Sequence, residues 1–191
     1  MSVLLKFALG VDWINERFSK LAAWSVFISA MICAGNAFIR YSLDNKSGGW
    51  FVKFYTSHAN GFLELQWYLF AVTVMIGAPF VLKMNEHVRV DLIYGKLKGY
   101  GPVYVDLFGL VFFLLPVVGM LLYMSAPYFY QAFLSKEMSQ NAGGLVRWPA
   151  ILTLPLGFGL LFAQGISEII KRVAYLAGKF EMDTHYEKPI Q

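Results

Sequence analysis

The sequence contains one cysteine and three histidines among its 191 residues. An intrachain disulfide is therefore impossible, and a zinc or iron–sulfur site has too few ligands. His58, His87 and His185 all lie outside the apolar stretches, which excludes a haem held by histidines inside a helical bundle. The only cysteine, Cys33, has no histidine at its depth, which argues against nucleophilic catalysis. We therefore expect no enzymatic activity, no cofactor and no metal site.

Charge is also scarce, because charged residues make up 15% of the sequence and hydrophobic residues 58%. Four long stretches carry no charged residue at all: Leu21–Ile39, Leu65–Leu82, Leu107–Ser135 and Trp148–Ser167. About 20 helical residues cross a hydrocarbon core of roughly 30 Å. The sequence therefore predicts an all-α integral membrane protein. We expect a single four-helix membrane domain over residues 1–191, with spans at about 18–40, 63–83, 103–125 and 148–171.

Three stretches need separate interpretation. Residues 2–18 carry apolar side chains near one helical face, which fits either an amphipathic helix in the membrane interface or a frayed lead-in to the first span. A second amphipathic helix is expected after the Gly48–Gly49 break. The third apolar stretch is too long for one span, so Ser125–Pro127 is expected to mark its end or a kink.

The basic residues follow the membrane topology and form no patch for nucleic acid. If the chain crosses the membrane four times, 11 of the 16 Lys and Arg residues fall on the side of the two termini and the middle loop, and 5 fall on the other. The positive-inside rule then places both termini in the cytoplasm. Charges interrupt the N-terminal residues, so we expect no cleaved signal peptide.

Ionisable residues inside a membrane usually mark a transport path, and the predicted spans hold almost none. Glu64, Asp106 and Glu168 lie at the ends of spans, where each can reach water or a basic neighbour. Salt bridges at the membrane interface are a simpler interpretation of these three residues than a transport path. We therefore expect that this chain transports nothing by itself.

The densest group of polar residues is Lys83–Tyr94, in the loop of residues 84–102. Its core contains Glu86, His87, Arg89 and Asp91. In a helix, Glu86 would reach Arg89 and His87 would reach Asp91, whereas in an extended segment these residues would alternate with apolar ones. Periodicity does not choose between the two conformations.

Four spans, with Asn85–Leu92 (sequence NEHVRVDL) directly after the second, resemble the small membrane subunit of the tripartite ATP-independent periplasmic (TRAP) transporters. The resemblance implies a bacterial inner-membrane complex that imports organic acids such as C4-dicarboxylates, keto acids or sialic acid. In such a complex a periplasmic protein captures the substrate, and a large membrane subunit moves it by an elevator motion driven by sodium.

In this family the small subunit is a scaffold for the large one and carries no substrate or sodium ligands. The resemblance makes Glu86, His87, Arg89 and Asp91 a structural motif or partner interface. It also lets the external loops at 40–61 and 135–147 help to dock the periplasmic protein. Competing interpretations are a four-helix membrane anchor for electron transfer, a small membrane enzyme and a self-assembling channel.

Overall fold

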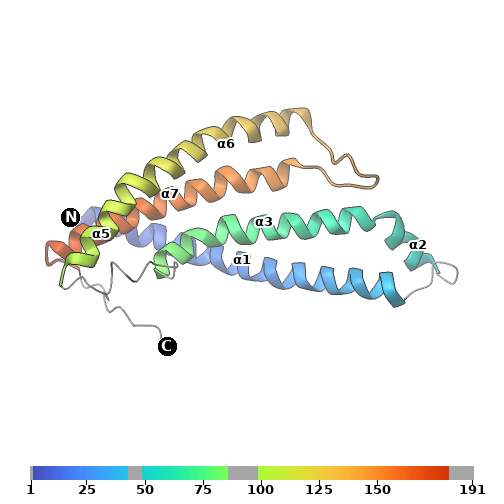
Figure 1. Cartoon of the computed structure of the whole chain (residues 1–191), viewed down its shortest axis with the longest axis horizontal. Coiled ribbons are helices and arrows are strands. Elements are labelled where there is room, and N and C mark those ends of the chain that lie inside the picture. The colour runs from blue at the N-terminus through green and yellow to red at the C-terminus, as the bar shows by residue number, and fades with distance from the viewer. Residues whose placement is uncertain (1, 43–48, 86–98, 181–191) are drawn as a thin grey trace.

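The computed structural model of the chain describes residues 2–42, 49–85 and 99–180, which are almost entirely helical (Figure 1). The elements are α1 (Ser2–Ser42), α2 (Trp50–Ser57), α3 (Ala59–Met84), α5 (Gly101–Gly109), the π-helical turn η1 (Leu110–Leu114), α6 (Leu115–Ser135) and α7 (Trp148–Leu176). No β-strand forms within the described ranges, where Met138 and Val146 make an isolated antiparallel bridge.

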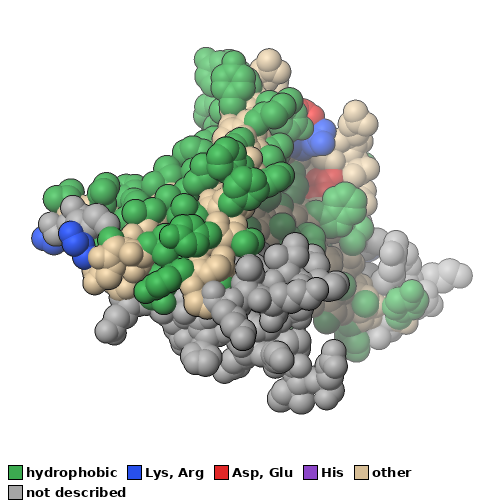
Figure 2. Space-filling view, turned by 60° about the vertical axis from the view of Figure 1, so that its left-hand side comes forward, with side chains coloured by type: hydrophobic (Ala, Val, Ile, Leu, Met, Phe, Trp, Pro, Cys, Tyr) green, Lys and Arg blue, Asp and Glu red, His purple; other side chains and the backbone are tan. Residues whose placement is uncertain are grey.

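Within the described residues, four helical segments are long and apolar enough to cross a membrane: α1, α3, the continuous helix α5–η1–α6, and α7. Their outer faces carry many exposed large hydrophobic side chains. Figure 2 shows such side chains covering most of the described surface in that view. An apolar surface of this extent needs lipid or protein against it. The prediction of an all-α protein with four transmembrane helices is confirmed.

At the end where α2 lies, the long helices are side by side in the order α6, α7, α3, α1, and at the other end α1 also contacts α7 (Figure 1). α7 packs against each of the other three. It is also the most buried of them, since 33% of its most apolar stretch is inside the protein, against 11–17% for the others. The fold is therefore built around α7.

The first helix differs from both interpretations of residues 2–18. α1 runs without a break from Ser2 to Ser42, so this stretch is neither a separate interfacial helix nor a frayed lead-in. Ala8, Val11 and Asp12 are buried, and Ala8 contacts the C-terminal half of α7. The physical reason is that polar side chains on this part of α1 have partners on α7.

Of the two alternatives for the third span, the helix end is wrong, because the helix does not end at Ser125–Pro127 but continues to Ser135 with Pro127 inside it. A π-helical turn lies earlier, at η1, where the amide of Leu115 donates to the carbonyl of Leu110. Pro116 follows directly, and a proline ring clashes with the carbonyl four residues before it. A π-helical turn is a common way to accommodate such a local disruption.

The expected external amphipathic helix is α2, which packs back onto the long helices. Trp50 stacks on Phe54 with ring centroids 5.9 Å apart, and Tyr55 stacks on Phe62 of α3 at 5.0 Å. The Tyr55 hydroxyl also donates to Asn36 Oδ1 of α1 at 2.5 Å. These contacts join α1 and α3 at the end of the molecule where α2 lies.

The packing of α3 against α7 requires glycine at position 157. A Cβ atom added to Gly157 would lie 2.6 Å from the carbonyl oxygen of Met75, closer than any real Cβ contact. Because the opposing atom belongs to the backbone, the helices themselves would have to move apart.

Replacing Gly157 with leucine should therefore lower the midpoint of thermal unfolding in detergent, since overpacking costs about 1–3 kcal/mol. Gly35→Leu is the matched control, because Gly35 is also helical and a Cβ atom added there would have no neighbour within 4 Å. That control should be neutral or slightly stabilising. Equal midpoints for the two variants would contradict the close approach of α3 and α7.

Candidate functional site

Polar side chains gather at two places near opposite ends of α7. The group near its C-terminal end, buried between α1, α5 and α7, is here named the charge cluster. Its members are Asp12, Asn15, Asp106, Gln164, Ser167, Glu168, Lys171 and Arg172. At the other end Glu64 binds the loop between α6 and α7, an arrangement here named the loop clasp.

Helical spacing brings the charge cluster together. On α7, Gln164, Glu168 and Lys171 recur at intervals of three or four residues and so share one face. On α1, the polar residues Asp12 and Asn15 lie three residues apart and share a face in the same way. Each helix therefore presents a polar stripe, and the two stripes face each other.

Two cations and three carboxylates form a connected network in the charge cluster. Lys171 Nζ donates to Asp12 Oδ2 at 3.0 Å and also to Glu168. Arg172 donates to Glu168 and reaches Asp106 Oδ2 of α5 at 3.1 Å. Glu168 is only 2% exposed and Arg172 only 4%, so these ion pairs are shielded from water.

The amide of Gln164 links the two halves of the charge cluster. Its Nε2 donates to Asp12 at 2.9 Å and to Glu168 at 3.0 Å, and its Oε1 accepts from Asn15 Nδ2 at 2.6 Å. Ser167 donates to Asp12 Oδ1 at 3.1 Å and to the carbonyl of Ala8 at 3.2 Å. In the described part of the chain, Asn15 Oδ1 is a buried side-chain atom with no partner.

This arrangement is suited to holding helices together. A buried charge is tolerated only when it is paired and hydrogen-bonded, and here the charged groups bond one another. Among the described residues, no group of three or more His, Cys, Asp or Glu side chains is arranged to hold a metal ion. The ion pairs and hydrogen bonds of the charge cluster connect α1, α5 and α7.

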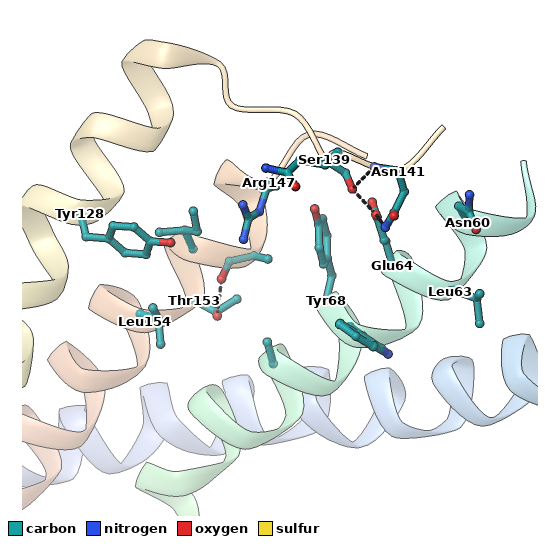
Figure 3. A pocket seen from close by; sticks show the side chains of 15 residues that line it. Asn60, Leu63, Glu64, Tyr68, Tyr128, Ser139, Asn141, Arg147, Thr153 and Leu154 are labelled. Atoms are coloured by element: carbon teal, nitrogen blue, oxygen red, sulfur yellow. Dashed lines mark hydrogen bonds between the residues drawn. The ribbon is translucent and has the colours of Figure 1, made fainter. Parts of the chain in front are cut away.

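The loop clasp fixes the segment between α6 and α7 onto α3 (Figure 3). Ser139 donates to Glu64 Oε1, Asn141 Nδ2 donates to the same oxygen at 2.9 Å, and the amide of Leu145 donates to Oε2 at 2.7 Å. Tyr68, one turn further along α3, donates to the carbonyl of Val146 at 3.1 Å. One carboxylate thus orders a loop far away in sequence.

A pocket of about 650 Å³ opens beside the loop clasp, between α3, α6 and α7. Its polar lining comes from the loop and from the first residues of α3, including Asn60 and Asn141. Its deeper lining is largely apolar and includes Ala71 and Leu154. Figure 3 shows Tyr128 of α6 and Arg147 directed toward this space.

The structure places the predicted charged residues at both ends of the helices. Asp106 and Glu168 meet through Arg172 in the charge cluster, whereas Glu64 lies apart from them in the loop clasp. The predicted motif residues lie outside the described residues; they are Glu86, His87, Arg89 and Asp91.

Sequence reasoning missed Asp12, Asn15 and Gln164. The first two lie in residues 2–18, where an interfacial helix would turn its polar side chains toward water. A usable signal was present in Gln164, the only amide side chain in the uncharged stretch Trp148–Ser167. A lone amide within a span usually has a polar partner on another helix.

Replacing Lys171 with methionine should lower thermal stability strongly, because it leaves Asp12 and Glu168 beside each other without their shared cation. Removing one partner of a buried pair costs about 3–5 kcal/mol. In Asp12→Leu/Lys171→Met the loss should be smaller than the sum of the single losses, which a double-mutant cycle measures.

The control for Lys171 is Lys83→Met. Lys83 pairs with Glu16 at 2.5 Å, but the Glu16 side chain is 51% exposed. Such a surface pair contributes about 0–1 kcal/mol. If both lysine variants lose the same stability, the buried ion pairs of Lys171 do not stabilise the contact between α1 and α7.

Replacing Glu64 with glutamine should loosen the loop clasp, because a neutral amide accepts weaker hydrogen bonds than a carboxylate. Hydrogen exchange of the Leu145 amide should become about tenfold faster. Glu137→Gln is the control, since Glu137 forms an exposed pair with Arg147 and does not bind that amide. Unchanged exchange at Leu145 would show that Glu64 does not order the loop.

Comparison with known proteins identifies a family. The sequence profile of the family described as "Tripartite ATP-independent periplasmic transporters, DctQ component" matches residues 54–174, which is more than half of the chain. The matched range contains the loop clasp and the α5 and α7 parts of the charge cluster, but not α1. No curated protein and no solved structure matches the chain. The chain belongs to the DctQ family and is a small, multi-pass inner-membrane subunit of a TRAP transporter.

Proposed function

We propose that this chain is the fixed scaffold of a sodium-coupled TRAP importer and that it binds neither substrate nor sodium itself. The observation that carries the proposal is the charge cluster, whose ionised side chains bond one another across three helices. A network that satisfies its own charges stiffens the protein and leaves few ligands for a passing ion. The substrates we propose are organic acids such as C4-dicarboxylates, keto acids or sialic acid.

Helix length and surface support the proposed scaffold role. α1 has 41 residues, so it is about 60 Å long and exceeds a hydrocarbon core of roughly 30 Å. Such a helix must tilt or extend into the interface, where its polar ends and aromatic residues resist sliding. An elevator-type subunit moves its substrate domain against a partner that stays in place, and these long helices supply that resistance.

We propose that both termini lie in the cytoplasm. Four membrane-crossing helices place the two ends on the same side, and that side carries 11 of the 16 Lys and Arg residues. The charge cluster then lies near the cytoplasmic surface and the loop clasp near the periplasmic surface. In this orientation the clasped loop faces the side from which the periplasmic binding protein arrives.

The proposed partners are a large membrane subunit, which forms a heterodimer with this chain, and a periplasmic binding protein that docks transiently. Docking on a preformed loop costs less conformational entropy than docking on a loop that must first become ordered. The hydrogen bonds from Ser139, Asn141 and Leu145 to Glu64 support this role for the loop at 135–147.

We further propose that the motif of Glu86, His87, Arg89 and Asp91 stabilises the junction of the second and third spans and its contact with the large subunit. The left-handed backbone of Asn85, with φ of 60°, ends α3 directly before the motif. Arg89 would pair with a carboxylate of the large subunit, or would join Asp106 and Glu168, which already bind Arg172.

Replacing Arg89 with alanine should reduce both the recovery of the two-subunit complex and substrate uptake, because a carboxylate would lose its partner. Uptake of a labelled organic acid is measured in proteoliposomes that contain both membrane subunits, with the binding protein outside and an inward sodium gradient. We expect a loss of about tenfold, the effect of one charge-assisted contact.

Lys96→Ala serves as the control, since Lys96 lies in the same loop outside the motif. It should leave assembly and uptake close to the unchanged protein. Normal assembly and uptake with Arg89→Ala would remove the proposed role of the motif. Full uptake by the large subunit and binding protein alone would remove the scaffold function itself.

A further inference from the structure

We propose that the pocket beside the loop clasp binds a zwitterionic phospholipid with a primary amine in its head group. The head group would lie among the polar residues at the pocket rim, and one acyl chain would follow the apolar wall between α3 and α7. This site is separate from the scaffold role proposed above and does not depend on it.

The pocket changes from polar to apolar along the helix axes, as a lipid does. Asn60 and Glu64 line it near the start of α3, while Ala71 lines it seven residues beyond Glu64, about 10 Å deeper at the rise of an α-helix. On α7, Leu154 lies deeper than Ala150 in the same sense. A volume of about 650 Å³ is within the usual range for small-molecule sites and suits a head group with the first part of a chain.

The charges at the rim match a head group that carries both signs. Arg147 Nη1 bonds Glu137 at 2.5 Å, but a guanidinium has five N–H donors, so it can also bind a phosphate. Glu64 accepts from Ser139, Asn141 and a backbone amide, none of which neutralises its charge. Glu64 and Arg147 are the charged residues that line the pocket, so its rim offers one carboxylate and one guanidinium to a head group that carries an ammonium group and a phosphate, and this pair of charges disfavours a purely anionic lipid.

Aromatic residues also support placing the pocket rim at the level of the lipid head groups. Trp67 lines the pocket and is 75% exposed, and Tyr68 and Tyr128 line it with hydroxyl groups on apolar rings. In Figure 3 the Tyr128 ring lies across the pocket from Tyr68, with its hydroxyl directed inward. Tryptophan and tyrosine concentrate where lipid head groups meet the hydrocarbon core.

The test uses the full-length chain as extracted in mild detergent, with any subunit that remains bound. After delipidation, phosphatidylethanolamine and phosphatidylglycerol are titrated separately, and the bound lipid is counted by native mass spectrometry. Phosphatidylethanolamine should bind in preference and raise the unfolding midpoint. Arg147→Gln should weaken its binding about tenfold, because one charge-assisted contact to phosphate is lost.

A second variant keeps the proposal falsifiable if Arg147→Gln disturbs the loop. Ala71→Phe fills the deep end of the pocket without touching a polar group, and it should abolish the lipid-dependent rise in midpoint. Lys136→Gln and Ala30→Phe are the controls, since neither residue lines the pocket and both lie on exposed surface.

Three results would overturn the assignment. Lipid retained in full by Ala71→Phe would show that it binds elsewhere on the surface. Equal binding of the two lipids, unaffected by Arg147→Gln, would show ordinary annular lipid. A preference for phosphatidylglycerol that Arg147→Gln removes would show a site for anionic lipid and refute the zwitterionic head group.

Discussion

The ion pair between Asp12 of α1 and Lys171 of α7 is the polar contact that links the first and the last helix of the described chain. Charges in a membrane protein are costly when they stand alone, so each needs the other helix to remain in place. Glu168 and Arg172 extend the pair to Asp106 of α5. Because α7 already packs against α3 and α6, fixing α1 and α5 to it orders all the long helices.

The charge cluster and the loop clasp connect helices that lie largely side by side. A row buries less surface than a closed bundle, and only a third of the most apolar part of α7 lies inside the protein. Van der Waals packing between helices is therefore limited, and directional polar contacts matter more. The charge cluster acts at one end of α7, while Glu64 and the α2 contacts act at the other. The open apolar faces remain available for lipid or for a larger subunit.

The sequence predicted much of this fold but less of the site. Four uncharged stretches predicted the four long helices, and NEHVRVDL led to the TRAP family that the matched profile confirms. The continuity of α1 was not predictable from amphipathic spacing, because an interfacial helix and a buried one can carry the same pattern. Pro127 suggested a helix end because proline lacks an amide donor, yet a long helix tolerates it.

By itself, the sequence determined the class of protein, the number of spans and the family, because hydrophobicity and a local motif are properties of neighbouring residues. Only the tertiary structure decided which polar residues work together. Asp12 and Lys171 are 159 residues apart, and Glu64 and Leu145 are 81 apart, so no local pattern relates them. Their partnership follows from the side-by-side packing of α1, α3 and α7, which brings each isolated charge to the group that can neutralise or bond it.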